Sequence, residues 1–264
     1  MLRRSPRWLG FSLACVLASA CGGGSSDDGA DDGATSSATT DTTAGTTAPG
    51  STGAPATTDA GESTMGPADS SGGAACTDEF PAIVTDIDET LTLSDEEFAM
   101  QLADGNYDPL ERDDASAMVN AYADLGYRVL YLTARSETFT TGVTNETARE
   151  VTERWLDEHG FPYGGDDTML VLAPSVVVGD ATTAYKAGAI ADLQAEGWRF
   201  DYAYGNADTD FAAYEDAMIG KDVTFSIGEL AGTDGTTAIP EDGYTQHLAD
   251  HLPTVPPVCD AAGG

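Results

Sequence analysis

The chain has 264 residues, in which 45 Asp and Glu residues outnumber 11 Lys and Arg residues and give a formal net charge of −34 at pH 7. Three of the basic residues, Arg3, Arg4 and Arg7, lie at the very start, so only eight remain in the rest of the chain. Proteins hold nucleic-acid phosphates with clustered Lys and Arg side chains. The composition therefore excludes nucleic acid as a partner.

The first 21 residues have the three parts of an export signal. The arginines are followed by an apolar run from Trp8 to Val16, which is too short to span a bilayer, and then by small residues that end at Cys21. The small residues before Cys21 and the three glycines after it resemble the lipobox of bacterial lipoproteins, although Ala18 stands where Leu or Val is usual.

We therefore expect residues 1–21 to be a lipoprotein signal whose lipidated Cys21 anchors an exported protein to a membrane, facing the periplasm or the cell exterior. An ordinary signal that is cleaved near Ala20 is the alternative. Residues 22–75 contain no Lys, Arg or aromatic residue, and Met65 is their only sizeable apolar side chain. Such a segment cannot bury enough apolar surface to offset its ordering entropy, so we expect a disordered Gly/Ser/Thr/Asp linker.

The four cysteines fall in three different parts of the chain. Cys15 lies in the signal, Cys21 takes the lipid, and Cys76 and Cys259 lie at the two ends of the remaining 189 residues. Exported domains commonly form disulfides. We expect one folded domain over residues 76–264, monomeric, with a disulfide between Cys76 and Cys259.

Apolar runs with strand periodicity alternate with helical spacing through this domain, which is typical of a parallel sheet with helices on both faces. We expect strands at 82–85, 128–132, 169–172, 198–204 and 223–227, and helices at 117–122, 148–155, 185–193 and 211–218, with a short helix around 244–252. The gaps after the first strand and between Arg135 and Lys186 are too short for a sizeable cap domain.

Polar residues directly follow the strands, where parallel sheets bind ligands. Asp86 and Asp88 follow the first strand, Thr133 follows the second, and Asn206 and Asp210 follow the fourth. Two carboxylates that face one point are tolerated only beside a cation or a proton, which indicates a divalent metal. With hard oxygen donors and no nearby Cys or His, the cation that these residues favour is Mg²⁺.

Lys186 lies near the start of a later helix, so its ammonium and the Thr133 hydroxyl are expected to face the same crevice and hold a phosphoryl group while a carboxylate attacks in line. Each residue also has a structural interpretation. Asp208 and Asp210 could complement a helix dipole, Lys186 could be solvated, and Thr133 could be a turn hydroxyl. The coincidence of all of them at strand ends favours a catalytic site.

His247 and His251 are four residues apart and could share a metal on a helix, but a solvated helix face is the expected interpretation because no third ligand follows from the sequence.

Four stretches resemble the motifs of haloacid-dehalogenase (HAD) superfamily phosphatases, and in particular the LNS2 domain of lipins, the Mg²⁺-dependent phosphatidate phosphatases. They are DIDETLTLSD (86–95), YRVLYLTAR (127–135), YKAGAIADL (185–193) and YGNADTDFAAY (204–214). The segment WLDEHGFPYG (155–164) also resembles the related domain of membrane-associated phosphatidylinositol-transfer proteins. The resemblance implies a HAD-like Rossmannoid sheet without a large cap.

The resemblance also implies roles for the residues that match the motifs. Asp86 would be the nucleophile that forms an aspartyl-phosphate, and Asp88 would protonate the leaving oxygen and then activate water. Thr133 and Lys186 would bind the phosphoryl group. Mg²⁺ would be held by Asp86, the backbone carbonyl of Asp88, and Asn206 or Asp210, with Asp208 a weaker candidate. Glu89 departs from the lipin pattern, which has glycine there, and is instead similar to class B and C secreted acid phosphatases.

The leading hypothesis is a membrane-tethered, Mg²⁺-dependent phosphomonoesterase with phosphatidate as substrate. The alternatives are a broad-specificity acid phosphatase, a non-catalytic phosphatidate-binding module, and a surface domain with a relic site. The 37 acidic and 8 basic residues of the domain would repel an anionic bilayer, and this repulsion would be offset by tethering or screened by salt.

Overall fold

The structure, a computed structural model of the chain, describes residues 78–240 and 243–259, which all belong to one compact unit. The expected signal, the linker and Cys76 lie outside the described residues. Cys259 is disulfide-bonded. Its pairing with Cys76 stays a prediction.

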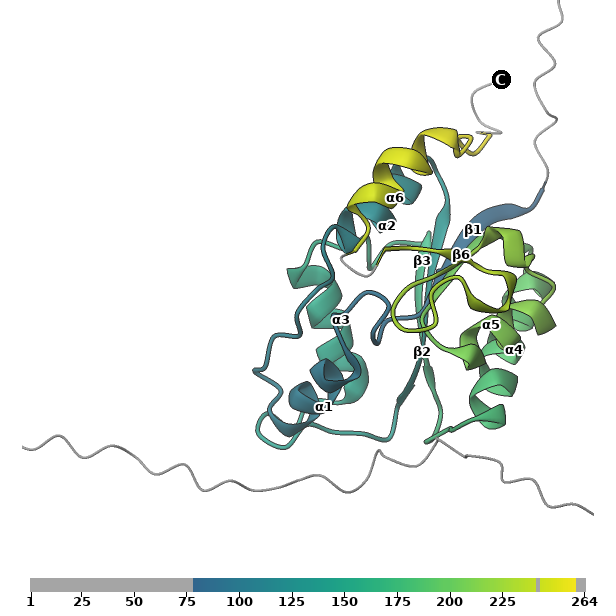
Figure 1. The fold of residues 1–264 in the computed structure, drawn as a ribbon. Coiled ribbons are helices and arrows are strands. Elements are labelled where there is room, and N and C mark those ends of the chain that lie inside the picture. The colour runs from purple at the N-terminus through teal and green to yellow at the C-terminus, as the bar shows by residue number, and fades with distance from the viewer. Residues whose placement is uncertain (1–77, 241–242, 260–264) are drawn as a thin grey trace, which may run out of the picture. The chain divides into compact units, whose positions relative to one another are not determined.

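In the described residues, six parallel strands form one sheet in the order β3-β2-β1-β4-β5-β6 (Figure 1). They are β1 (Phe80–Thr85), β2 (Arg128–Ser136), β3 (Thr168–Ala173), β4 (Trp198–Gly205), β5 (Thr224–Ser226) and β6 (Thr237–Ala238). β1 lies between β2 and β4, with Thr85 opposite Tyr131 on one side and Tyr204 on the other. The end of β1 is therefore fixed from both sides.

Helices cover both faces of this sheet (Figure 1). One face carries α2 (Ala115–Asp124), α3 (Ala148–Glu158) and α6 (Thr245–Asp250), and the other carries α4 (Asp180–Ala195) and α5 (Asp208–Asp216). Successive side chains of a strand point to opposite faces, so Ile83 packs in the first core and Val84 in the second. The structure confirms the parallel α/β fold that the apolar periodicity predicts.

Two elements differ from the sequence-based expectation. The nine-residue helix α1 (Asp95–Ala103) occupies the gap after β1, and the two-residue strand β6 extends the sheet. Three acidic residues fill the first turn of α1, and its buried positions include polar Glu97 and Gln101, so its apolar periodicity is weak. The gap after β2 holds α3 and β3 as expected. Among the described helices, none combines the length and apolar character that a membrane span requires.

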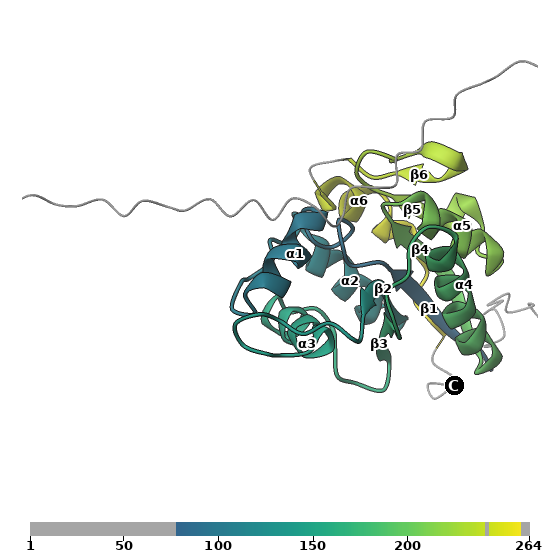
Figure 2. The same ribbon diagram turned by 90° about the horizontal axis from the view of Figure 1, so that it is seen from below.

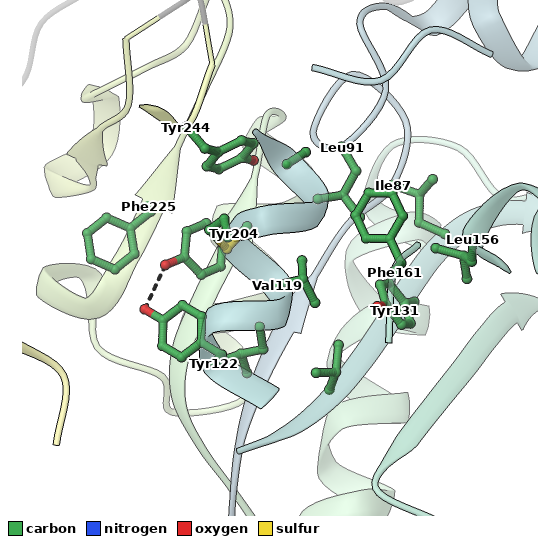
Figure 3. Close-up of a cluster of buried hydrophobic side chains, with 14 of the residues drawn as sticks. Ile87, Leu91, Val119, Tyr122, Tyr131, Leu156, Phe161, Tyr204, Phe225 and Tyr244 are labelled. Carbon is green, nitrogen blue, oxygen red and sulfur yellow. Dashed lines mark hydrogen bonds between the residues drawn. The ribbon is translucent and has the colours of Figure 1, made fainter. Parts of the chain in front are cut away.

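Aromatic side chains join the C-terminal segment to the first core (Figure 3). The hydroxyls of Tyr122 and Tyr204 lie 2.7 Å apart, and each also contacts a histidine. Nε2 of His247 lies 2.8 Å from the Tyr204 hydroxyl, and Nε2 of His251 lies 3.1 Å from the Tyr122 hydroxyl. His247 is only 7% exposed. The expectation of a solvated histidine face is therefore wrong, because the two imidazoles find hydrogen-bond partners inside the aromatic cluster.

The burial of His247 predicts a pH dependence of stability. Burial, and secondarily the neighbouring His251, lower the pKa of His247 to about 4. The unfolded chain binds this proton at about pH 6.5, so the free energy of unfolding should fall between about pH 6.5 and 4, by up to about 3 kcal/mol from this residue. We expect His247→Gln to flatten the dependence in urea unfolding measured from about pH 7 to pH 5.

His159 provides a control, because its effect on the pH dependence of stability has the opposite sign. Burial alone would lower its pKa, but hydrogen bonds with Asp108 and Glu111 outweigh burial and raise it. The stability that His159 contributes is present below about pH 6.5 and is lost as the pH rises. His159→Gln should therefore cost more stability in acid than at neutral pH. A His247→Gln variant that keeps the pH dependence of the wild type would contradict the neutral, buried state of this imidazole.

Candidate active site

The residues singled out in the sequence meet at the carboxyl edge of the sheet, which Figure 2 views from below. Asp86 directly follows β1, Thr133 lies near the end of β2, and Asn206 and Asp210 follow β4. Lys186 reaches the same edge from the second turn of α4. Ligands of parallel α/β sheets bind at this edge, so the fold brings the predicted residues to the place where chemistry is expected.

Lys186 is the centre of the site. Its Nζ lies 2.6 Å from Oδ1 of Asp86 and 2.6 Å from Oδ1 of Asp210. All three side chains are buried, with exposed fractions of 2%, 4% and 1% respectively. The solvated role that is usual for a lysine therefore does not apply to Lys186, because its ammonium joins α4 to the end of β1 and to the first turn of α5.

One ammonium between two buried carboxylates leaves an excess of negative charge. Burial raises the pKa of Asp86, Lys186 opposes the rise, and Asp210 and Asp88 add to it, so that the pKa reaches about 7. For Lys186 burial acts to lower the pKa, but Asp210 and Asp86 outweigh this effect and raise it. The lysine thus stays charged, and the carboxylates around it have capacity for a second cation.

Asp210 and Asn206 have different partners. Oδ2 of Asp210 accepts hydrogen bonds from the backbone N–H groups of Asn206 and Ala207, both at 3.2 Å, so this carboxylate caps α5 while it holds Lys186. The hydroxyl of Thr90 lies 3.1 Å from Oδ1 of Asn206 and 3.3 Å from Oδ2 of Asp86. Asn206 is therefore coupled to Asp86 through Thr90. Asp208 is exposed at the first residue of α5.

Asp88 is held by two donors from the end of β2. Arg135 contacts both carboxylate oxygens, with Nη2 2.8 Å from Oδ1 and Nε 3.0 Å from Oδ2, and the Thr133 hydroxyl donates to Oδ2 at 3.1 Å. The Thr133 hydroxyl also accepts from the backbone N–H of Arg135 at 3.1 Å. Thr133 must therefore exchange its bond to Asp88 before its hydroxyl can donate to a phosphoryl group.

Arg135 lies in the candidate site, although it is not among the site residues that the sequence predicts. It is 3% exposed, its Nη1 donates to Thr152 on α3 at 2.7 Å, and its guanidinium lies 4.2 Å from the ring centroid of Phe98 on α1. The pairing of β2 with β3 is irregular between Thr133 and Ser136, a feature that redirects side chains at the end of a strand. The one signal in the sequence was its position two residues after Thr133.

Glu89 shapes the turn that follows the two aspartates. Its φ of 57° lies in the left-handed region, its carbonyl accepts from Nε of Arg112 at 2.9 Å, and its N–H donates to the Thr92 hydroxyl at 3.0 Å. The side chain accepts from Nδ2 of Asn206 at 3.1 Å. Glu89 therefore fixes the loop after β1 and orients the amide of Asn206.

The donors at this edge fit a divalent cation that prefers oxygen ligands. The carboxylate of Asp86, the backbone carbonyl of Asp88 and the amide oxygen of Asn206 could hold such an ion. Asp210 is the weaker candidate, because its two oxygens already bind Lys186 and two backbone N–H groups. Within the described residues, no group of three His, Cys, Asp or Glu side chains could hold a metal by itself.

The site thus contains a buried aspartate at the end of the central strand, a second acid two residues later, a strand-end threonine, and a lysine paired with a further aspartate. The family model "PITM 1-3, LNS2 domain" matches residues 83–228, more than half of the chain. The protein belongs to the LNS2 domain family. No curated protein matches the chain.

Solved structures of HAD-like phosphatases and related proteins are similar to the chain at low identity. A protein from Mesorhizobium loti, described as a HAD-like phosphatase, has 15% identity and a TM-score of 0.47, with 69% of this chain and 88% of that chain covered. The class C acid phosphatase from Bacillus anthracis with tungstate bound has 19% identity and a TM-score of 0.35, with 51% and 55% covered.

A chain in the Pnkp1/Rnl/Hen1 RNA repair complex has 18% identity and a TM-score of 0.41, with 57% of this chain and 44% of that chain covered. The protein therefore spans about half the length of the acid phosphatase and of the repair-complex chain.

Because Arg135 binds both carboxylate oxygens of Asp88, replacing it with lysine is expected to lower kcat. Lysine keeps the positive charge but cannot bind both carboxylate oxygens as the planar guanidinium does. We expect Arg135→Lys to lower kcat on an aryl phosphate at least about tenfold with little change in KM, because Asp88 loses its orientation while substrate binding persists.

Arg149→Lys is the matched control, since Arg149 pairs with Glu137 in a half-exposed position. This variant should keep the wild-type kcat. An unchanged kcat in a folded Arg135→Lys protein would show that Asp88 does not depend on Arg135.

Proposed function

We propose that the protein is a Mg²⁺-dependent phosphomonoester hydrolase that works through an aspartyl-phosphate at Asp86, with phosphatidate as its substrate. The observation that carries the proposal is the carboxylate of Asp86, buried at the end of β1 and held by Lys186 at 2.6 Å. A structural ion pair would not need a second acid and a strand-end hydroxyl at the same edge. Here Asp88 and Thr133 are both present and bonded to each other.

In the first step an oxygen of Asp86 attacks phosphorus in line with the ester oxygen. The bond from phosphorus to the ester oxygen breaks, and that oxygen takes a proton from the carboxylic acid form of Asp88. Lys186, positioned beside the attacking oxygen, stabilises the charge that develops on the phosphoryl oxygens. The product of this step is a free alcohol and a phosphorylated Asp86.

In the second step Asp88, now a carboxylate, accepts a proton from water as the water oxygen attacks phosphorus. The acyl-phosphate bond breaks, inorganic phosphate leaves, and Asp86 is regenerated as a carboxylate. Hydrogen bonds from Arg135 and Thr133 fix the position of the Asp88 side chain, which supports its role in the proton transfers of both steps. Bound Mg²⁺ would neutralise phosphoryl charge at this edge, with Asp86, the carbonyl of Asp88 and Asn206 as the residues that would hold it.

The choice of phosphatidate rests on two features. The first is that the chain belongs to the LNS2 family. The second is that the gap after β1 holds the short helix α1 and no cap domain, so the site can admit a headgroup presented by a bilayer. A soluble phosphate ester fits the same open site. The residues around Asp86 therefore support a phosphate monoester as the substrate. That the alcohol of this ester is the bulky lipid part of phosphatidate is the further step of the proposal.

The assay that tests the proposal compares phosphatidate in mixed micelles with a small aryl phosphate, with Mg²⁺ present and after chelation. We expect both substrates to turn over with Mg²⁺, and a loss of at least about a hundredfold after chelation. We expect Asp86→Asn to abolish turnover, because an amide cannot act as the nucleophile. Asp208→Asn is the matched control, since this exposed carboxylate should contribute nothing.

Each result of this assay would favour one of the alternative functions over the others. Turnover of the aryl ester alone would favour a broad-specificity acid phosphatase. Binding of phosphatidate without turnover of either substrate would favour a binding module. The absence of both binding and turnover would favour a relic site. Activity that survives Asp86→Asn would defeat the mechanism for every substrate.

We further propose that the protein is exported and anchored through a lipid on Cys21, as its N-terminal sequence indicates. Cys21→Ala should move the protein from the membrane fraction to the soluble fraction. A variant that fractionates with membranes as the wild type does would contradict the lipid anchor. The disulfide between Cys76 and Cys259 is part of the same proposal, since an exported domain meets oxidising conditions.

A further inference from the structure

The loop after β1 turns on a single carbonyl. The backbone N–H groups of residues 90–92 all donate to the carbonyl of Ile87, at 3.3, 2.8 and 3.0 Å respectively. This turn brings the Thr90 hydroxyl back beside the residue that starts the loop, 3.3 Å from Oδ2 of Asp86 and 3.1 Å from Oδ1 of Asn206. One buried hydroxyl therefore lies between the proposed nucleophile and a candidate ligand of Mg²⁺.

Three successive carbonyls of this loop are held by donors from outside it. Arg112 donates from its side chain to the carbonyl of Glu89 at 2.9 Å and from its backbone N–H to the carbonyl of Leu91 at 2.9 Å. The carbonyl between them, that of Thr90, accepts from the hydroxyl of Tyr244 at 3.0 Å. Tyr244 is therefore the outside partner that holds the residue whose side chain faces the proposed nucleophile.

Tyr244 is itself fixed by its surroundings. It is fully buried, its backbone N–H donates to the carbonyl of Asp113 at 2.8 Å, and its ring lies edge-on to that of Tyr204, with the ring centroids 6.1 Å apart (Figure 3). A phenylalanine ring would fill the same space, whereas a buried tyrosine hydroxyl needs a hydrogen-bond partner. Tyr244 lies beyond residues 83–228, which match the family model, so this support comes from a part of the chain outside the match.

We propose that Tyr244 is a positioning residue of the phosphatase site, which keeps the Thr90 hydroxyl against the nucleophile by holding the carbonyl of the same residue. This inference rests on the proposed function, since it assigns a kinetic role at that site. Lys186 binds Oδ1 of Asp86 at 2.6 Å, while the Thr90 hydroxyl faces Oδ2. Contacts on both oxygens fix the rotation of the carboxylate, and a carboxylate that rotates freely is less often aligned with phosphorus.

Removal of the hydroxyl alone tests the proposal. Tyr244→Phe keeps the buried ring, and we expect it to lower kcat on an aryl phosphate about tenfold while KM stays within about twofold. The reason is that the alignment of the nucleophile changes, while the groups that bind the phosphoryl group stay in place. A kcat equal to that of the wild type would overturn the proposal. A raised KM with an unchanged kcat would also overturn it, because the effect would then lie in substrate binding.

Tyr127→Phe is the matched control. The hydroxyl of Tyr127 also donates to a backbone carbonyl, that of Pro256, at 3.1 Å, and the residue is buried. It directly precedes β2, at the end of the strand opposite the site. This variant should lose a similar hydrogen bond and keep the wild-type kcat under conditions in which both variants are folded. Equal losses of kcat in the two variants would indicate a general effect on stability and would overturn the proposal.

A double variant shows whether Tyr244 acts through Thr90. Thr90→Val removes the hydroxyl and keeps the carbonyl that Tyr244 binds, so this variant has already lost the contact with the nucleophile. Introducing Tyr244→Phe should then change kcat less than about twofold, compared with about tenfold in the wild-type background. The same factor in both backgrounds would overturn the proposal, because it would show that the two residues act independently.

Amide hydrogen exchange on the full chain gives a measurement that needs no turnover. Residues 90–92 should exchange faster in Tyr244→Phe than in Tyr127→Phe, because their N–H groups form the turn that Tyr244 holds. Identical exchange of these residues in the two variants would overturn the proposal.

The outcome for the proposed function stays separate from the outcome for Tyr244. Failure of the wild type to hydrolyse any phosphate monoester would defeat the proposed function, while hydrogen exchange would still show whether Tyr244 holds the loop. An active wild type with an equally active Tyr244→Phe variant would defeat only the role of Tyr244.

Discussion

The bond of Lys186 to two buried carboxylates is the interaction on which the rest of the site depends. It connects the end of the central strand with two helices on one face of the sheet, α4 and the first turn of α5. A buried carboxylate without a partner is strongly unfavourable, so these three segments must meet in one arrangement. The same ammonium both fixes the fold at this edge and lies where phosphoryl charge would develop.

Asp88 belongs to a second, separate network. Arg135 and Thr133 hold it from β2, and Arg135 is in turn held by α3 and by the ring of Phe98 on α1. The two aspartates of the motif, only two residues apart, are therefore positioned by opposite sides of the central strand. In the proposed mechanism, this division would let Asp86 stay fixed while Asp88 exchanges hydrogen bonds with substrate and water.

Sequence alone located Asp86, Thr133, Lys186, Asn206 and Asp210, because their positions at strand ends and a helix start follow from apolar periodicity and from the topology of parallel sheets. It did not locate Arg135, whose direction depends on the irregular end of β2. It missed α1, which has little apolar periodicity. It misplaced the two histidines, because a spacing of four residues is the same on a solvated helix and on one packed against aromatic rings.

The C-terminal segment has a consequence for the order of folding. The hydroxyl of Tyr244 donates to the carbonyl of Thr90 at 3.0 Å, and the side chain of Thr90 contacts both Asp86 and Asn206. The loop that carries Asp86 thus receives one of its supports from a residue far along the sequence. Because Tyr244 and Thr90 are 154 residues apart in the sequence, the loop around Asp86 reaches its final arrangement only when the segment that contains α6 has packed against it.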